Sequence, residues 1–278
     1  MGLCGSSPEG DLLPVQRKDL LEHKALFDFL GFNGKERVRL CESFWNFDRD
    51  GNMEISFREF RKGVGVSANR YVKNHFLRSD GSDDGTLSLG EYVICSWNFC
   101  TIEPHDFPSH TYFGYVTGDE DSGINIDTML HLVDEATGIL SGTNEFGNKE
   151  MNLAGGNVVD HSKNREREER AIKKVASADG KVHMKGFVEY AKKHPFLVMK
   201  TINFQTNFQE ATLGGAKGWN RLTSKRSELL KGKLKFIHGD KLVEWIGKRC
   251  GKDYTKGDKH KELPTQEDTA GSNYVVRE

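Results

Sequence analysis

The chain has 278 residues, of which 36% are hydrophobic and 29% charged, and its net charge is −1. This length and composition are typical of a soluble protein of about two domains, and the apolar runs are shorter than the roughly 18 residues that span a membrane. No secretory segment follows Met1, and the five cysteines have neither disulfide nor zinc-site spacing. We therefore expect an intracellular protein with reduced thiols.

Charge is distributed unevenly along the chain. Residues 42–160 hold 20 acidic against 8 basic side chains, whereas residues 221–261 hold 13 basic against 5 acidic. Blocks of opposite sign favour an internal contact or attachment of the basic block to an anionic membrane. Nucleic acid is not an expected partner, because the acidic block would repel phosphates.

The N-terminus reads M-G-L-C-G-S. Gly2, exposed by loss of Met1, and Ser6 four residues later fit the N-myristoylation pattern, and Cys4 is a candidate for palmitoylation. A single myristoyl chain binds membranes only weakly, so stable attachment needs the second acyl group or a basic patch. Residues 1–18 are therefore predicted to be an acylated tether that holds the protein at the cytoplasmic face of a membrane.

Residues 20–30 have the spacing of an amphipathic helix. The apolar side chains predicted to share one face are Leu20, Leu21, Leu26, Phe27 and Leu30. Such a helix either packs into a core or faces a membrane, and the spacing favours the core.

Two stretches of twelve residues, 48–59 and 80–91, share one pattern. They read D-R-D-G-N-M-E-I-S-F-R-E and D-G-S-D-D-G-T-L-S-L-G-E, with oxygen-bearing side chains at positions 1, 3, 5, 9 and 12. Calcium accepts six to eight oxygens at loosely constrained angles, so alternate residues of a short loop can wrap around it. The pattern predicts two calcium sites, and the alternative is a pair of acidic surface turns.

Position 7 of each loop is expected to offer its backbone carbonyl, and the glutamate at position 12 both of its oxygens. The predicted ligands are Asp48, Asp50, Asn52, Glu54, Ser56 and Glu59 in the first loop, and Asp80, Ser82, Asp84, Thr86, Ser88 and Glu91 in the second. Position 6 normally holds glycine because φ is positive there, and Gly85 conforms. Met53 departs from this rule. A residue other than glycine with positive φ costs about 1–2 kcal/mol, so Met53 is expected to weaken the first site.

The apolar residues around the loops also repeat. Position 8, where paired loops form a short strand contact, holds Ile55 and Leu87. Positions 10 and 13, which begin the helix leaving each loop and face the core, hold Phe57, Phe60, Leu89 and Tyr92. Because ligands and core positions agree in both stretches, residues 19–100 resemble a pair of hands of the EF-hand superfamily.

Two further loops fit the same apolar pattern, which predicts a second pair over residues 101–195. Positions 8, 10 and 13 hold Ile124, Ile126 and Met129 in the third loop and Val182, Met184 and Phe187 in the fourth. Neither loop has a carboxylate at position 12, so neither is expected to bind calcium at signalling concentrations. The alternative is that this region is an unrelated helical domain.

Three segments complete the predicted organisation. Residues 141–162, rich in glycine and asparagine, are expected to be a flexible insertion. Residues 196–251 are expected to form a basic helical extension, and residues 252–278 a disordered tail. A basic amphipathic helix with Trp245 is suited to an EF-hand groove or an anionic membrane, and the alternative is ordinary packing on the lobes. We place the segment 242–246 in the groove as a hypothesis.

The resemblance covers residues 35–195 and implies an all-α fold of paired EF-hand lobes, followed here by the helical extension. It implies that Ca²⁺ is bound and that the protein is a sensor, which opens to expose aromatic side chains to a partner helix. Those side chains include Phe44, Phe47, Phe60 and Phe76. The alternatives are a calcium-responsive subunit or scaffold of an enzyme complex, and a passive calcium buffer.

Catalytic signatures are not found in the sequence. The run G-G-A-K-G-W at residues 214–219 lacks the spacing of a phosphate-binding loop, and the histidines are scattered without the spacing of a zinc helix. No nucleophile elbow or kinase signature occurs. The protein is therefore not expected to be an enzyme.

Overall fold

The structure, a computed structural model, describes the chain in four stretches: 14–116, 122–137, 161–230 and 239–254. Helices account for most of these residues, and the strands form two short two-stranded sheets, so the predicted all-α class is confirmed. The predicted acylation sites Gly2 and Cys4 lie outside the described residues. Most of the predicted insertion and the tail from residue 255 onward lie outside them as well.

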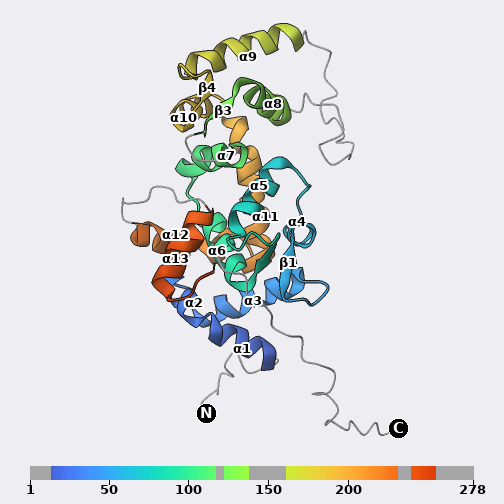
Figure 1. Ribbon diagram of the computed structural model, residues 1–278, viewed down its shortest axis with the longest axis vertical. Helices are drawn as coiled ribbons and strands as arrows, with labels where there is room; N and C mark the ends of the chain where they lie inside the picture. Colours follow the sequence, from blue (N-terminus) through green and yellow to red (C-terminus); the bar gives the residue numbers. More distant parts are fainter. Residues whose placement is uncertain (1–13, 117–121, 138–160, 231–238, 255–278) are drawn as a thin grey trace, which may run out of the picture.

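Residues 14–100, called the first half below, occupy the lower and middle parts of Figure 1. Its elements are α1 (Pro14–Glu22), α2 (Lys24–Leu30), α3 (Gly34–Phe47), β1 (Glu54–Ser56), α4 (Phe57–Val64), α5 (Arg70–Ser79), β2 (Thr86–Ser88) and α6 (Leu89–Cys100). Helices α4 and α6 begin at Phe57 and Leu89, the position-10 residues predicted to begin the helix that leaves each loop.

The lead-in segment is two helices, and the prediction of one helix is wrong because the chain turns at His23 between α1 and α2. Leu26, Phe27 and Leu30 are fully buried, which confirms that the segment packs into the core. Leu21 lies before the turn and is 71% exposed, so it does not share the apolar face.

Strands β1 and β2 join the two acidic loops. They pair antiparallel, with Ile55 opposite Leu87, and both side chains are fully buried. This is the contact predicted for position 8. Phe60 and Tyr92 at position 13 and Leu89 at position 10 are also buried, as predicted, whereas Phe57 at position 10 is only partly buried and packs against the core.

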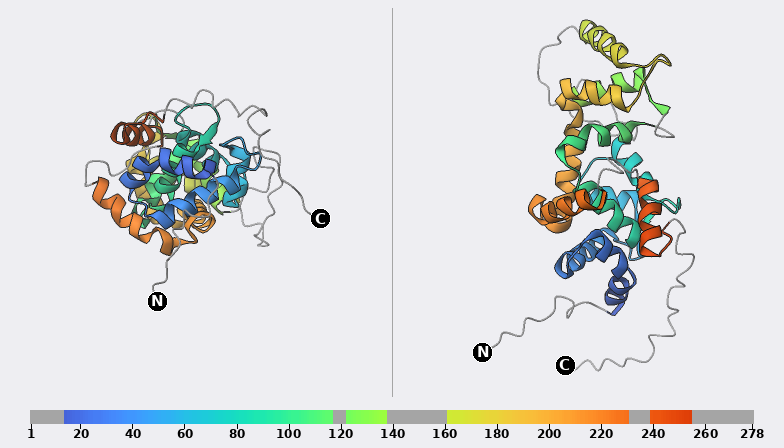
Figure 2. Two further views of the ribbon diagram at one scale, coloured as in Figure 1. Left: turned by 90° about the horizontal axis from the view of Figure 1, so that it is seen from below. Right: turned by 90° about the vertical axis from the view of Figure 1, so that its left-hand side faces the viewer.

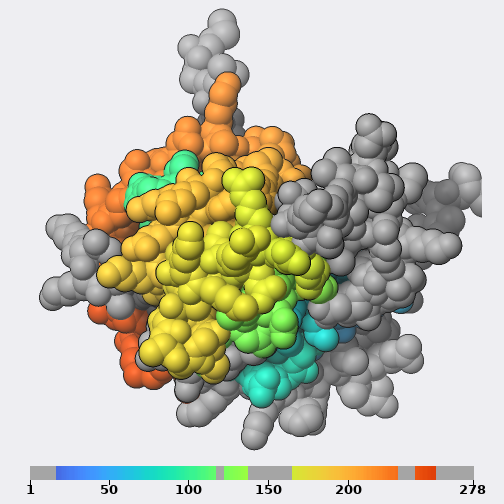
Figure 3. Space-filling model, turned by 90° about the horizontal axis from the view of Figure 1, so that it is seen from above, coloured from blue at the N-terminus to red at the C-terminus, as the bar shows by residue number. Residues whose placement is uncertain are grey.

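The second half, formed by the described residues between 104 and 193, repeats this arrangement at the upper end of the molecule. Its elements are η1 (Pro104–Asp106), α7 (Phe107–Tyr115), β3 (Ile124–Asn125), α8 (Ile126–Thr137), α9 (His161–Val175), β4 (Lys181–Val182) and α10 (Met184–Lys193). Strand β3 pairs antiparallel with β4 and sets Ile124 opposite Val182, the two residues predicted for position 8. The segments around α9 and α10 cover this end of the molecule, with α8 beside them (Figure 3). Since α9 begins at His161, the predicted insertion extends too far by two residues.

The C-terminal extension is helical, as predicted. Its elements are η3 (Pro195–Val198), α11 (Met199–Leu213), α12 (Ala216–Leu230) and α13 (Gly239–Cys250). Helix α11 runs along the long axis of the molecule (Figures 1 and 2) and packs against α3, α4, α6 and α7. It ends at Gly214, whose φ of 78° is the left-handed conformation that glycine adopts without strain. Helix α11 therefore connects the two halves.

Helix α13 packs against α2, α5 and α6, whereas the rings that contact Phe60 across the aromatic face come from α11. Its side chains Leu242, Val243 and Ile246 are fully buried in that contact. The alternative of ordinary packing on the lobes is thus confirmed, and the hypothesis that this segment fills the groove is wrong.

Tyr254 is 6% exposed and stacks on His23 at 6.2 Å between ring centroids, so the predicted disordered tail begins too early. In the described part of the chain, no helix has the length and apolarity needed to cross a membrane.

Gly114 allows α7 to approach α5 closely. A Cβ atom at this position would lie 2.2 Å from the ring of Tyr71, and this ring is buried. We expect Gly114→Ala to lower the free energy of unfolding by about 1–3 kcal/mol, because an added methyl group overpacks the interface. Urea denaturation followed by circular dichroism measures the change.

The matched control is Gly34→Ala in the first turn of α3, where an added Cβ meets nothing within 4 Å. This variant should be neutral or more stable by up to about 1 kcal/mol, since alanine reduces the entropy of the unfolded chain. Equal stability of the two variants would contradict close packing at Gly114.

Candidate metal centre

Asp48 organises the first acidic loop from its first position. It caps the C-terminus of α3, and its two carboxylate oxygens accept hydrogen bonds from three loop amides. Oδ1 accepts from Gly51 N at 2.9 Å and from Asn52 N at 3.1 Å, and Oδ2 accepts from Met53 N at 2.9 Å. These bonds turn the chain around the carboxylate.

Glu59, at the last position, closes the same loop. Its Oε1 accepts a hydrogen bond from Arg49 N at 2.9 Å, and its Oε2 accepts from Ser56 N at 3.0 Å and from the Ser56 hydroxyl at 2.7 Å. Ser56 is the N-cap of α4, so the start of this helix and the fold-back of the glutamate are one local structure. The carboxylate thus faces the loop, and Glu59 is only 8% exposed.

Three carboxylates of the first loop converge. One oxygen each of Asp48, Asp50 and Glu59 lies within 4.8 Å of the others. Oxygens on opposite sides of a calcium ion are separated by roughly 4.6–5.2 Å, twice the usual calcium–oxygen distance. The spacing and the hard oxygen donors therefore fit a calcium ion.

The second loop has a similar hydrogen-bond network. Asp80 Oδ2 accepts from Gly85 N at 2.8 Å, and Glu91 Oε1 accepts from Ser82 N at 2.9 Å. Glu91 Oε2 accepts from Ser88 N at 2.9 Å and from the Ser88 hydroxyl at 2.8 Å. Position 3 holds Ser82 instead of an aspartate, so the described residues of this loop do not form the compact group of three acids found in the first.

The backbone follows the same path in both loops. Position 4 has positive φ in each, 73° at Gly51 and 57° at Asp83. Position 6 has φ of 68° at Met53 and 86° at Gly85. The prediction that Met53 adopts the strained left-handed conformation is therefore confirmed.

The loops also contact each other through side chains. The Thr86 hydroxyl donates to Glu54 Oε2 at 3.1 Å, and both residues stand at position 7. The same hydroxyl lies 2.7 Å from Asp84 Oδ1. Together with the β1–β2 pairing, this contact joins the predicted ligand sets of the two loops.

The loop environment shifts the pKa values of three predicted ligands. Burial raises the pKa of Asp48, although amide hydrogen bonds from Met53 and Gly51 oppose the shift. Burial also raises the pKa of Glu91, against hydrogen bonds from Ser88. At Glu59 burial acts in the same direction, but hydrogen bonds from Ser56 and loop amides outweigh it and the pKa is lowered. Two of the three charges are thus unfavourable unless a cation compensates them.

The third and fourth loops use their polar groups differently. Asn125 Oδ1 accepts from Thr128 N at 2.7 Å. Asp179 accepts from Lys181 N at 3.1 Å and lies 3.0 Å from His183 Nε2. Position 6 of the fourth loop, Gly180, keeps a positive φ of 74°. Residues 117–121 of the third loop lie outside the described residues, so the absence of calcium binding there stays a prediction.

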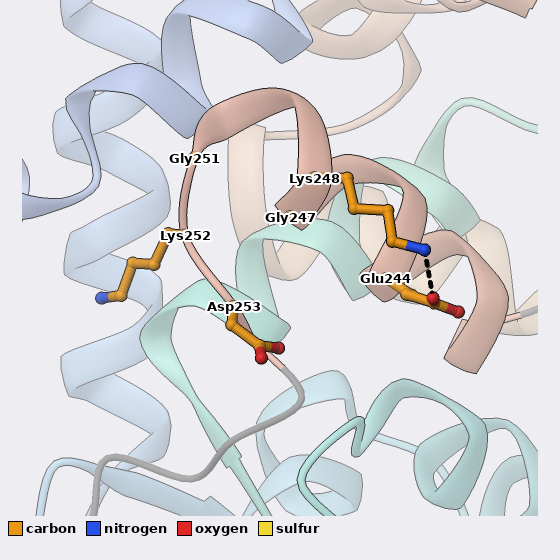
Figure 4. A pocket seen from close by; sticks show the side chains of 6 residues that line it. All are labelled: Glu244, Gly247, Lys248, Gly251, Lys252 and Asp253. Atoms are coloured by element: carbon orange, nitrogen blue, oxygen red, sulfur yellow. Dashed lines mark hydrogen bonds and ion pairs between the residues drawn. The ribbon is translucent and has the colours of Figure 1, made fainter.

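Other reactive groups are buried or dispersed. Among the described cysteines, Cys41, Cys95, Cys100 and Cys250 are free thiols, and burial raises the pKa of each. A surface hollow of roughly 530 Å³ lies at the end of α13 (Figure 4). Its lining consists of Glu244, Gly247, Lys248, Gly251, Lys252 and Asp253. Lys248 is paired with Glu244 in it, while Lys252 points away from both (Figure 4).

Sequence reasoning missed a group of residues at the C-terminal end of α6. Arg226 is 7% exposed and donates to Asn98 O at 2.9 Å and to the Thr101 hydroxyl at 3.1 Å. Its guanidinium also lies 4.9 Å from the Trp97 ring centroid, and burial lowers its pKa to about 10. Gln205 and Gln209 of α11 donate to other carbonyls of the same helix end. The available signal was the repeat F-Q-T-N-F-Q at residues 204–209.

Comparison with known proteins gives no relative: no protein-family model, curated protein or solved structure matches the chain.

Met53 and Gly85 provide a reciprocal test of loop strain. We expect Met53→Gly to raise the free energy of unfolding by about 0.5–1 kcal/mol, because glycine adopts positive φ without the penalty of a side chain. Gly85→Ala should lower it by about 1 kcal/mol, and its Cβ would meet nothing within 4 Å, so sterics with neighbours are not involved. Denaturation in the presence of a calcium chelator measures both changes, and the same sign for both would contradict the strain.

Proposed function

We propose that this chain is a calcium-binding regulatory protein of the EF-hand type, with one Ca²⁺ in each of the loops 48–59 and 80–91. The observation that carries the proposal is the fold-back of both final glutamates. Glu59 and Glu91 each accept hydrogen bonds from an amide early in the loop and from the serine three residues before them. Two loops so arranged present carboxylates inward, and among the described residues no basic side chain forms an ion pair with them.

The donor sets are suited to calcium. Every predicted ligand offers oxygen, and six of the ligands are carboxylates: Asp48, Asp50, Glu59, Asp80, Asp84 and Glu91. Hard oxygen donors without sulfur or imidazole favour Ca²⁺ over zinc or copper. A bound ion would supply the positive charge that offsets the burial of Asp48 and Glu91.

The relation between the loops supports the EF-hand assignment. One short antiparallel contact joins the first loop to the second, and another joins the third to the fourth. In both contacts the paired residues stand at position 8 counted from the start of each loop. An unrelated helical domain at residues 101–195 would have no reason to repeat this register.

The aromatic face that is expected to bind a partner helix is covered by a helix of the same chain. Phe44, Phe47, Phe60 and Phe76 are at most 5% exposed, and α11 covers the face to which Phe60 belongs. Exposure of this face to another protein requires α11 to leave it. Regulation is favoured over passive buffering because α6, which begins at the second loop, ends in hydrogen bonds to the C-terminal helices. The same contacts suit a regulatory subunit or scaffold of an enzyme complex.

Calcium titration by calorimetry tests the two sites. We expect the wild-type chain to bind two ions, and Glu59→Gln and Glu91→Gln each to lose roughly tenfold or more in affinity at one site. The reason is that glutamine keeps the shape of the side chain but removes the charge and one of the two acceptor oxygens.

Glu189→Gln is the matched control, since Glu189 is an exposed residue of α10 away from both acidic loops. Its titration should equal that of the wild type. A wild-type chain that binds no calcium at millimolar concentration would refute the proposed function.

A further inference from the structure

Helix α11 fills the aromatic face of the first half with two phenylalanines one turn apart. The Phe204 ring lies 4.9 Å from that of Phe99 and 6.0 Å from that of Tyr71, centroid to centroid. The Phe208 ring lies 5.4 Å from Phe60. These partners come from α4, α5 and α6, so one helix contacts the elements that enter and leave the two acidic loops.

Each phenylalanine is followed by a glutamine that holds the C-terminal end of α6. Gln205 Nε2 donates to Phe99 O and Ile102 O, both at 2.9 Å. Gln209 Nε2 donates to Cys100 O at 2.7 Å. The last carbonyls of a helix have no i+4 amide within the helix, and the glutamines supply donors to Phe99 and Cys100 at this helix end and to Ile102 just beyond it. The face therefore accepts a helix with the repeat F-Q-x-x-F-Q.

Helix α6 joins this contact to the second acidic loop. Its N-terminal turn contains Glu91, whose carboxylate faces the loop, and its C-terminal turn receives the two glutamines. Helix α4 makes a similar link, since Glu59 lies in its first turn and Phe60 touches Phe208. The loops hold their glutamates inward in the same structure in which α11 is seated.

We propose that the face lined by Phe60, Tyr71, Tyr92 and Phe99 is a helix-binding surface whose ligand is α11 of the same chain, and that calcium and α11 stabilise each other's binding. The inference rests on the proposed calcium sites and extends them. One conformation of α4 and α6 places the glutamates over the loops and fits the repeat F-Q-x-x-F-Q. By linkage, an ion that stabilises this conformation strengthens the binding of α11 to the face, and bound α11 raises the calcium affinity by the same factor.

The double variant Gln205→Ala, Gln209→Ala tests the coupling in the full chain. It removes the hydrogen bonds to α6 and leaves both phenylalanines in place. We expect calorimetry to show a loss of calcium affinity of about tenfold, within the range typical of coupled sites. The control is Asn203→Ala, Thr206→Ala, which changes two exposed positions of the same helix and should bind calcium as the wild type does.

Hydrogen exchange of the wild-type chain gives a readout that does not depend on the variants folding. Amides of residues 199–213 should exchange more slowly with calcium than with a chelator. If the wild type binds calcium but these amides exchange equally in both conditions, or a folded glutamine variant binds calcium as its control does, the coupling is refuted and the calcium sites stand. If the wild type binds no calcium, the sites and the coupling are refuted together.

Discussion

The structure depends on two glutamates, each turned back over the loop that precedes its own helix. A carboxylate in this position accepts hydrogen bonds from both ends of the loop and therefore fixes where the exit helix begins. Glu91 is 1% exposed, and its carboxylate accepts hydrogen bonds from two amides and a serine hydroxyl. Burial disfavours the charged form of a carboxylate, and a bound cation at the proposed site would offset that cost.

The second organising feature is α11, which lies between the two halves. Its middle packs Phe204 and Phe208 into the first half, while the Thr201 hydroxyl near its start lies 2.6 Å from that of Thr111 in α7. The end of α6 is held jointly by α11 and by the buried Arg226 of α12. A change in the direction of α6 therefore has to be accommodated by the C-terminal helices. The C-terminal extension is thus part of the core.

Much of the candidate site could be predicted because it is local in sequence. The left-handed backbone at Met53, the strand contact of Ile55 with Leu87 and the burial of Phe60 all follow from twelve-residue loops whose turns and caps are encoded within the loop. The prediction of a single lead-in helix is wrong because one helical pattern was extended across a turn. The prediction places Leu21 on the same face as Leu26, but the turn at His23 lies between them and Leu21 is exposed.

The sequence by itself determined the two acidic loops, the four strand-forming positions and the helical character of the extension, since each depends on residues that are close together in the sequence. Only the tertiary structure decided which helix covers the aromatic face. Helices α11 and α13 both carry apolar stripes, and periodicity does not distinguish them. In the folded chain Gln205 and Gln209 of α11 donate to carbonyls at the end of α6, more than 100 residues earlier in the chain. Such a match between distant polar groups is formed by packing and has no local signature.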